Sequence, residues 1–211
     1  PIMLSQEFSG YSVRSHIESI KRANESIKYI GIGGTAVGTG INSDKRYASH
    51  AVKEISSFTK IRFAQSKNMF EFMQSLSHET NLSSSLRNLA LSFIKISNDL
   101  RLLGSGPATG LAEISLPAVQ PGSSIMPGKV NPVIAEMMDM VGFQVIGNDT
   151  TIALAAQAGQ LELNVMMPVV AYNLLNSVEI LSNGIKTLTE KCLAGIKVNE
   201  HNTKVERKLV D

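Results

Sequence analysis

The last quarter of the chain carries a heptad repeat, the pattern of a long α-helix packed against other helices. Its apolar residues recur at alternating intervals of four and three, at Met167, Ala171, Leu174, Val178, Leu181, Ile185 and Leu188. Residues at this spacing share one helical face and suit left-handed packing, whereas a strand would place every second residue on one side. The repeat therefore predicts a helix over 167–188 within a helical bundle.

Four further helices are predicted from the same kind of periodicity. They cover 13–27, 45–58, 82–100 and a segment that starts at Pro132. Asn131 is well placed as the N-cap of the last of these, with Pro132 at its first helical position. Strand signals are nearly absent, so the predicted fold class is all-α, a bundle of long helices. A second apolar stripe on such helices needs a partner, which predicts self-association with closed symmetry.

Composition excludes several classes of function. The 211 residues are 43% hydrophobic, and 20 Lys+Arg against 18 Asp+Glu leave a net charge of only +2 without a basic run, which argues against nucleic acid. No apolar stretch approaches the roughly 18 residues of a membrane span. Cys192 is the single cysteine, and it fits a reducing, cytoplasmic compartment. The chain starts at Pro1 inside an amphipathic pattern, which suggests a piece of a longer protein.

Two glycine-rich segments resemble nucleotide-binding motifs only superficially. GIGGTA at 31–36 follows a predicted helix, whereas the dinucleotide fingerprint follows a strand; Thr35 and Thr39 stay available to a ligand. GSSIMPGK at 122–129 has five residues instead of four between its glycines, and a valine follows its lysine where a phosphate loop needs Ser or Thr. Both segments are therefore interpreted as connections between helices.

The second segment, GSSIMPGKVNP at 122–132, also has the chemistry of an anion-binding cup. Ser123 and Ser124 supply hydroxyl groups, Lys129 supplies a cation, and Asn131 precedes a helix whose N-terminal dipole points back into the loop. An ordinary polar connector has a similar composition, so composition alone leaves both interpretations open. The histidines are scattered singly, without ligand spacing, and no metal site is predicted.

GSSIMPGKVNP resembles the signature loop of the aspartase/fumarase superfamily. The resemblance extends over most of the chain, through GGTAVGTGIN (33–42), SNDLRLLGSGP (97–107), LAEISLPAVQPG (111–122) and QVIGNDTTIALAAQAGQLELNVMMP (144–168). It implies a long-helix bundle that assembles into homotetramers with active sites shared between subunits. It also implies that residues 1–195 form the central helical domain and that 196–211 begin a small C-terminal domain.

The resemblance further implies roles for individual residues. Ser123 matches the residue that removes a proton from the carbon next to the leaving group, and Glu136 matches an acid that supports the histidine of the site. Ser124, Lys129 and Asn131 match positions at or beside the bound carboxylate of a small dicarboxylate substrate. Proton removal there gives an enediolate, which a cation and aligned donors stabilise, and Ser123 needs the same electropositive setting to act as a base. The chemistry requires no cofactor.

The substrate expected from the resemblance is L-aspartate, converted to fumarate with loss of ammonia. VIGNDTT and AGQLELNVM resemble aspartases, whereas Met166–Pro168, read as MMP, occurs in some fumarases. Ala108 stands where many members have arginine after SGP. Fumarate hydratase is therefore the alternative activity, and a non-catalytic helical assembly module is a further alternative.

Overall fold

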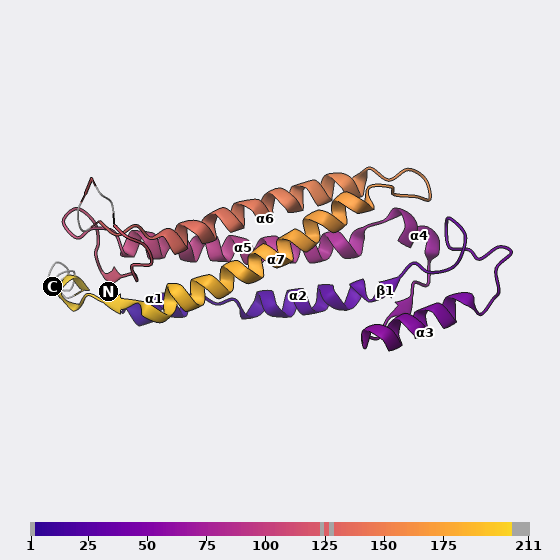
Figure 1. Ribbon diagram of the computed structural model, residues 1–211, viewed down its shortest axis with the longest axis horizontal. Helices are drawn as coiled ribbons and strands as arrows, with labels where there is room; N and C mark the ends of the chain where they lie inside the picture. The colour runs from indigo at the N-terminus through magenta and orange to yellow at the C-terminus, as the bar shows by residue number, and fades with distance from the viewer. Residues whose placement is uncertain (1–2, 123–124, 127–128, 204–211) are drawn as a thin grey trace. The chain divides into compact units, whose positions relative to one another are not determined.

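The computed structural model describes residues 3–122, 125–126 and 129–203, and these form an all-α fold dominated by three long helices (Figure 1). The α-helices are α1 (Leu4–Ser9), α2 (Arg14–Ile27), α3 (Tyr47–Thr59), α4 (Met69–Gln74), α5 (Ser77–Leu103), α6 (Val133–Gln157) and α7 (Met167–Lys191). The short elements are strands β1 (Tyr29–Ile30), β2 (Ala64–Gln65), β3 (Ile114–Ser115) and β4 (Lys197–Val198), and a 3-10 turn, η1 (Leu193–Gly195). None of the helices formed by the described residues has the length and apolar character that a membrane crossing needs.

All five helices predicted from periodicity are present, with small differences at their ends. α6 begins at Val133, one residue later than predicted, and the Glu136 amide donates its helical hydrogen bond to the Pro132 carbonyl over 3.0 Å. Pro132 therefore occupies the capping position that the sequence analysis gave to Asn131. The missed elements are short: α1 and α4 have six residues each, and every strand has two.

The buried face of α7 differs from the predicted one by one residue in each heptad. Leu174, Leu181 and Leu188 are buried as predicted. The second residue of each heptad that was predicted to be buried is not: Val170, Ser177 and Gly184 are buried in place of Ala171, Val178 and Ile185. Small side chains at 177 and 184 allow close helix packing: a Cβ added to Gly184 would lie 3.3 Å from Met138 Sδ on α6.

The described residues form two compact units, and α5, α6 and α7 contribute to both of them. The first unit comprises the described parts of 1–13, 87–146 and 178–211, and the second comprises 14–86 and 147–177.

The first unit packs the end of α5 against the start of α6 and the end of α7. Leu100, Met138, Val145 and Leu188 are almost fully inaccessible to solvent. Gly142 of α6 lies against α5 so closely that a Cβ there would come within 2.5 Å of the Ile94 side chain. β3 and β4 pair antiparallel, with Ile114 opposite Val198, so the segment after α7 is fastened beside the connection that precedes α6.

Buried polar side chains join the helices of the second unit. Ser83 of α5 donates to Asp149 Oδ1 of α6 over 2.6 Å. The amide nitrogen of Asn148 lies 3.0 Å from Asn176 Oδ1 and 3.0 Å from Ser177 Oγ on α7. Asn164 Nδ2 donates to the Ala155 carbonyl over 3.0 Å and to the Ala156 carbonyl over 3.1 Å, near the end of α6. These bonds satisfy side chains that would otherwise be buried without partners.

The glycine-rich segment 31–40 is a folded loop that lies in the second unit. It follows β1, which pairs in parallel with β2. Gly33 approaches Gly38 so closely that a Cβ would fall 1.9 Å from the Gly38 carbonyl oxygen, so a larger residue has no room. Thr35 Oγ1 and Thr39 Oγ1 lie 3.2 Å apart and hydrogen-bond to each other. The expectation that a helix directly precedes this segment is wrong, because the two-residue strand β1 lies between α2 and Gly31. No helix opens within 31–40, as the dinucleotide fingerprint requires, so the interpretation as a tight connection is consistent with this geometry.

Candidate active site

The loop at 122–132 and the first turns of α6 hold all five residues predicted for the site. Ser123 and Ser124 lie outside the described residues. Lys129, Asn131 and Glu136 are described, and the first two occupy the short connection that leads into α6.

The two ends of the loop touch each other. Gly122 lies so close to Lys129 that a Cβ at position 122 would be 2.6 Å from the Lys129 carbonyl oxygen. The Lys129 amide in turn donates to the Met126 carbonyl over 3.1 Å, which forms a turn. The close approach of positions 122 and 129 requires glycine at 122, because a side chain there would collide with the Lys129 backbone.

The described end of the loop places a cation and an amide beside the positive end of a long helix. Lys129 is exposed, and among the described residues no carboxylate pairs with its ammonium group. Asn131 is half-buried, and its carbonyl accepts from the Val133 amide over 2.9 Å. Because the first amides of a helix carry partial positive charge, this arrangement favours an anionic ligand.

Glu136 is a half-buried side chain in the first turn of α6. A carboxylate in this turn interacts favourably with the helix dipole. Its negative charge also acts on Asp139, three residues further along, and contributes to raising the pKa of that carboxyl.

A charged pair next to Glu136 was missed by the sequence analysis. Asp139 Oδ2 accepts from Arg101 Nη1 over 2.8 Å, and the same nitrogen donates to Asn98 Oδ1 over 3.1 Å. The Asp139 side chain is 5% exposed, and its Oδ1 is buried without a hydrogen-bond partner among the described residues. Burial raises the pKa of Asp139, Arg101 lowers it through a hydrogen bond and its charge, and Glu136 raises it, with a net upward shift.

The burial pattern of α6 explains why Asp139 needs a partner. Asp139 lies four residues after Ala135 and one after Met138, both buried, so a charged residue stands on the apolar face of α6. A carboxylate on such a face requires a buried partner, because an isolated charge is costly to bury. The partner itself lies 38 positions earlier on α5, a distance that periodicity does not reveal.

The four histidines, at positions 16, 50, 78 and 201, lie far apart in the sequence. His78 packs with Tyr29 and Phe72, with ring centroids 6.4 and 6.3 Å apart. Across the described ranges, no group of three or more His, Cys, Asp or Glu side chains has the arrangement of a metal site.

The sequence of this chain is similar to those of known lyases. A protein-family model described as "Lyase" matches residues 1–147. The aspartate ammonia-lyase of Bacillus subtilis (strain 168) is 48% identical over 206 residues, which covers 97% of this chain and 43% of that protein. The class II fumarate hydratase of Xylella fastidiosa (strain Temecula1) is 44% identical over 203 residues, covering 95% of this chain and 43% of its own length.

Solved structures share the fold. The crystal structure of a fumarate lyase:delta crystallin from Brucella melitensis superposes with a TM-score of 0.93 at 43% identity, over 97% of this chain and 45% of that one. The chain thus spans less than half the length of the relatives it matches.

Proposed function

Because this chain belongs to the lyase family of the aspartase/fumarase superfamily, we propose that the complete protein is an aspartate ammonia-lyase, which converts L-aspartate to fumarate and ammonia. The aspartate ammonia-lyases of Bacillus subtilis and Helicobacter pylori (strain 26695), at 48% and 50% identity, support this substrate. The segments VIGNDTT and AGQLELNVM support it as well.

In the proposed reaction the Ser123 oxygen removes a proton from the β-carbon of aspartate. The electron pair of that C–H bond moves towards the neighbouring carboxylate and produces an enediolate with additional negative charge. The carbon–nitrogen bond then breaks, ammonia leaves, and the C=C double bond of fumarate forms. Because the enediolate carries this additional negative charge, its stabilisation is the main task of the site.

The observation that carries the proposal is the folded loop between Gly122 and Lys129 at the N-terminus of α6. We assign substrate binding to Ser124, Lys129 and Asn131, since an exposed cation and a helix N-terminus favour the carboxylates of the substrate and the enediolate. We assign to Glu136 the support of a histidine that another part of the complete protein supplies. The same positive surroundings would lower the pKa of the Ser123 hydroxyl.

Fumarate hydratase is the second candidate activity, and a specific segment favours it. Met166–Pro168 resembles some fumarases, and a class II fumarate hydratase matches at 44% identity. The two activities share the proton removal and differ in the leaving group, which is water instead of ammonia.

We also propose that the protein is a cytoplasmic homotetramer whose subunits share active sites. Several large apolar side chains are exposed on α6 and α7 in the single chain: Met140, Phe143, Leu154, Tyr172, Leu175 and Val178. A monomer seldom exposes so many apolar side chains on regular helices, so their exposure supports burial against other subunits. We also propose that residues 196–211 begin a further small domain.

The test measures fumarate formation by ultraviolet absorbance with the complete protein, from L-aspartate and, separately, from L-malate. Fumarate formation from L-aspartate would support the ammonia-lyase, and fumarate formation from L-malate alone would support the hydratase. Ser123→Ala should lower kcat by at least about a thousandfold with little change in substrate binding, whereas Ser182→Ala, at an exposed position of α7, serves as the matched control. Near-wild-type kcat in Ser123→Ala would refute the role of Ser123, and a tetramer inactive on both substrates would favour the non-catalytic assembly module.

A further inference from the structure

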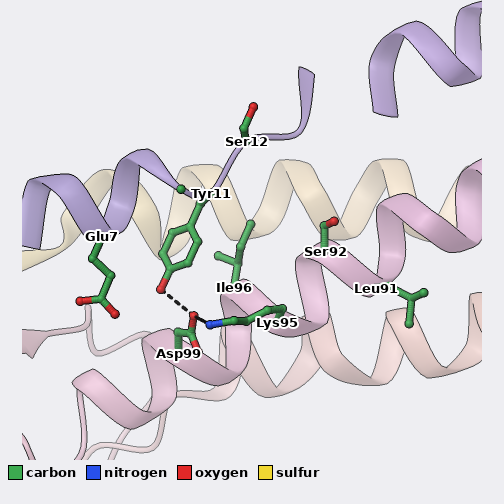
Figure 2. Close-up of a pocket in the computed structure, with 9 residues that line it drawn as sticks. Glu7, Tyr11, Ser12, Leu91, Ser92, Lys95, Ile96 and Asp99 are labelled. Atoms are coloured by element: carbon green, nitrogen blue, oxygen red, sulfur yellow. Dashed lines mark hydrogen bonds and ion pairs between the residues drawn. The ribbon is translucent and has the colours of Figure 1, made fainter. Parts of the chain in front are cut away.

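A pocket of about 500 Å³ lies between the N-terminal segment and one face of α5, within the first unit. This volume is in the range of small-molecule sites. Figure 2 shows the residues that line it as sticks. They come from residues 7–12 and from successive turns of α5: Glu7, Gly10, Tyr11, Ser12, Leu91, Ser92, Lys95, Ile96 and Asp99.

One wall of the pocket is a connected group of three polar side chains. The Tyr11 hydroxyl donates to Asp99 Oδ2 over 2.7 Å, and the Lys95 ammonium pairs with the same oxygen (Figure 2). Lys95 Nζ also lies 5.8 Å from the centroid of the Tyr11 ring. The charge of Asp99 is therefore balanced by Lys95. Burial and the hydrogen bond to Asp99 raise the pKa of Tyr11, so its hydroxyl stays protonated at neutral pH.

Glu7 leaves this pocket with an excess negative charge. It lies four residues before Tyr11 and lines the same pocket, and its charge adds to the upward shift of the Tyr11 pKa. Among the described residues no cationic side chain lies within ion-pair distance of Glu7. With Lys95 balancing Asp99, the lining carries a net charge of −1. A carboxylate ligand, such as the substrate proposed above, is therefore disfavoured here.

The remaining lining is mixed: Ser12 and Ser92 are polar, and Leu91, Ile96 and the Tyr11 ring supply apolar surface. Leu91 is 48% exposed at the edge of the pocket, Ile96 is 8% exposed, and the Tyr11 ring faces α5 (Figure 2). A ligand that suits this lining combines a donor-rich positive group for Glu7 with a short hydrocarbon portion for Ile96 and the Tyr11 ring.

We propose that this pocket binds a small organic cation, a primary ammonium group on a short apolar chain. The ammonium group donates to the Glu7 carboxylate and to the lone pairs of the Tyr11 oxygen, and its chain lies against Ile96 and the ring of Tyr11. This binding does not depend on the lyase activity proposed above.

The test titrates n-butylammonium, n-butanol and n-butyrate into the complete protein and measures binding by calorimetry. We expect n-butylammonium to bind at least about tenfold more tightly than the neutral and anionic compounds, because only the ammonium group makes a charge-assisted hydrogen bond. Glu7→Gln keeps the shape and removes the charge, and should weaken binding about tenfold. Glu54→Gln makes the same change at an exposed site of α3 outside the pocket and should leave binding unchanged.

A second variant tests the location independently. Tyr11→Phe keeps the ring but removes the oxygen that accepts from the ammonium group, and it should also weaken binding of n-butylammonium about tenfold. Absence of binding to the wild-type protein, equal binding of n-butanol, or unchanged binding in Glu7→Gln and Tyr11→Phe would overturn the proposal. None of these results would alter the fumarate assay, so the two proposals fail separately.

Discussion

Arg101 Nη1 lies 2.8 Å from Asp139 Oδ2, and this ion pair joins the last turn of α5 to the second turn of α6. The two side chains differ in exposure, 40% for Arg101 and 5% for Asp139. Loss of the guanidinium would therefore leave a buried charge without a partner, whereas loss of the carboxylate would leave a cation that water can still reach. Because Asp139 is one turn beyond Glu136, the pair also holds the segment on which the proposed site is built.

Removal of the arginine should destabilise the protein. Arg101→Met leaves the buried Asp139 carboxylate without its cation, and we expect the free energy of unfolding at pH 7.5 to fall by about 2 kcal/mol, less than for a fully buried pair because Arg101 is partly exposed. Urea denaturation measures the change. Arg46→Met is the matched control, since Arg46 pairs with Asp44 on the surface and its loss should lower the free energy of unfolding clearly less. Equal effects of the two substitutions would contradict the importance of burial.

The pH dependence of stability should report on Asp139. Its pKa is raised in the folded protein above 3.8, so between pH 3.8 and the folded pKa the folded state holds more protons than the unfolded state. The preference of the folded protein for protonated Asp139 therefore stabilises it fully below pH 3.8. This stabilisation is lost as the pH rises through the folded pKa. Asp139→Asn removes the titration, and its stability relative to wild type should increase as pH is raised from about 4. Denaturation curves from pH 3.5 to 7.5 measure the difference; parallel profiles would show that Asp139 is not perturbed.

Closure of the signature loop should require glycine at position 122. Gly122→Ala would place its Cβ 2.6 Å from the Lys129 carbonyl oxygen, so the loop must open. We expect kcat/KM to fall by about a hundredfold, the scale expected for displaced site residues, with less than about 1 kcal/mol lost in stability because the position is exposed. Steady-state kinetics and urea denaturation of the same variant separate the two effects. Full activity in Gly122→Ala would mean that the closed loop is not the active arrangement.

Two glycines of α6 should respond in opposite directions to alanine. A Cβ at Gly147 would meet nothing within 4 Å, so Gly147→Ala should stabilise the protein by up to about 1 kcal/mol through helix propensity. At Gly142 the Cβ would lie 2.5 Å from Ile94, and Gly142→Ala should destabilise by about 1–3 kcal/mol through overpacking. Thermal unfolding of the two variants provides the comparison. A loss of stability in Gly147→Ala would indicate that this position is covered in the assembled protein.

The sequence predicted the helices well because their periodicity is long and local. The heptads of α7 identified Leu174, Leu181 and Leu188 correctly, but packing turned the helix so that Ser177 replaced Val178 in the buried seam. An apolar side chain at 178 satisfies the pattern equally well, and only the neighbouring helices decide which stripe is covered.

Contacts between distant segments account for most of what the sequence did not predict. The two-residue strands are too short to leave a pattern, and their pairing depends on segments far apart in the chain. For the site, the cation at Lys129 and the helix start beside it follow from the motif, although the helix begins at Val133 instead of Pro132. The Arg101–Asp139 and Tyr11–Asp99 contacts require knowledge of which helices are neighbours.

The amide of Asn148, bonded across to Asn176 and Ser177, fixes the lengthwise alignment of α6 and α7. An apolar seam that repeats every seven residues is nearly as well satisfied after one helix slides by a heptad, about 10 Å along its axis. A slide of that size would carry the buried amide away from its acceptors on α7, which are the side chains of Asn176 and Ser177 and the carbonyl of Asn173. The polar cluster thus penalises misaligned pairings that hydrophobic contact alone would tolerate.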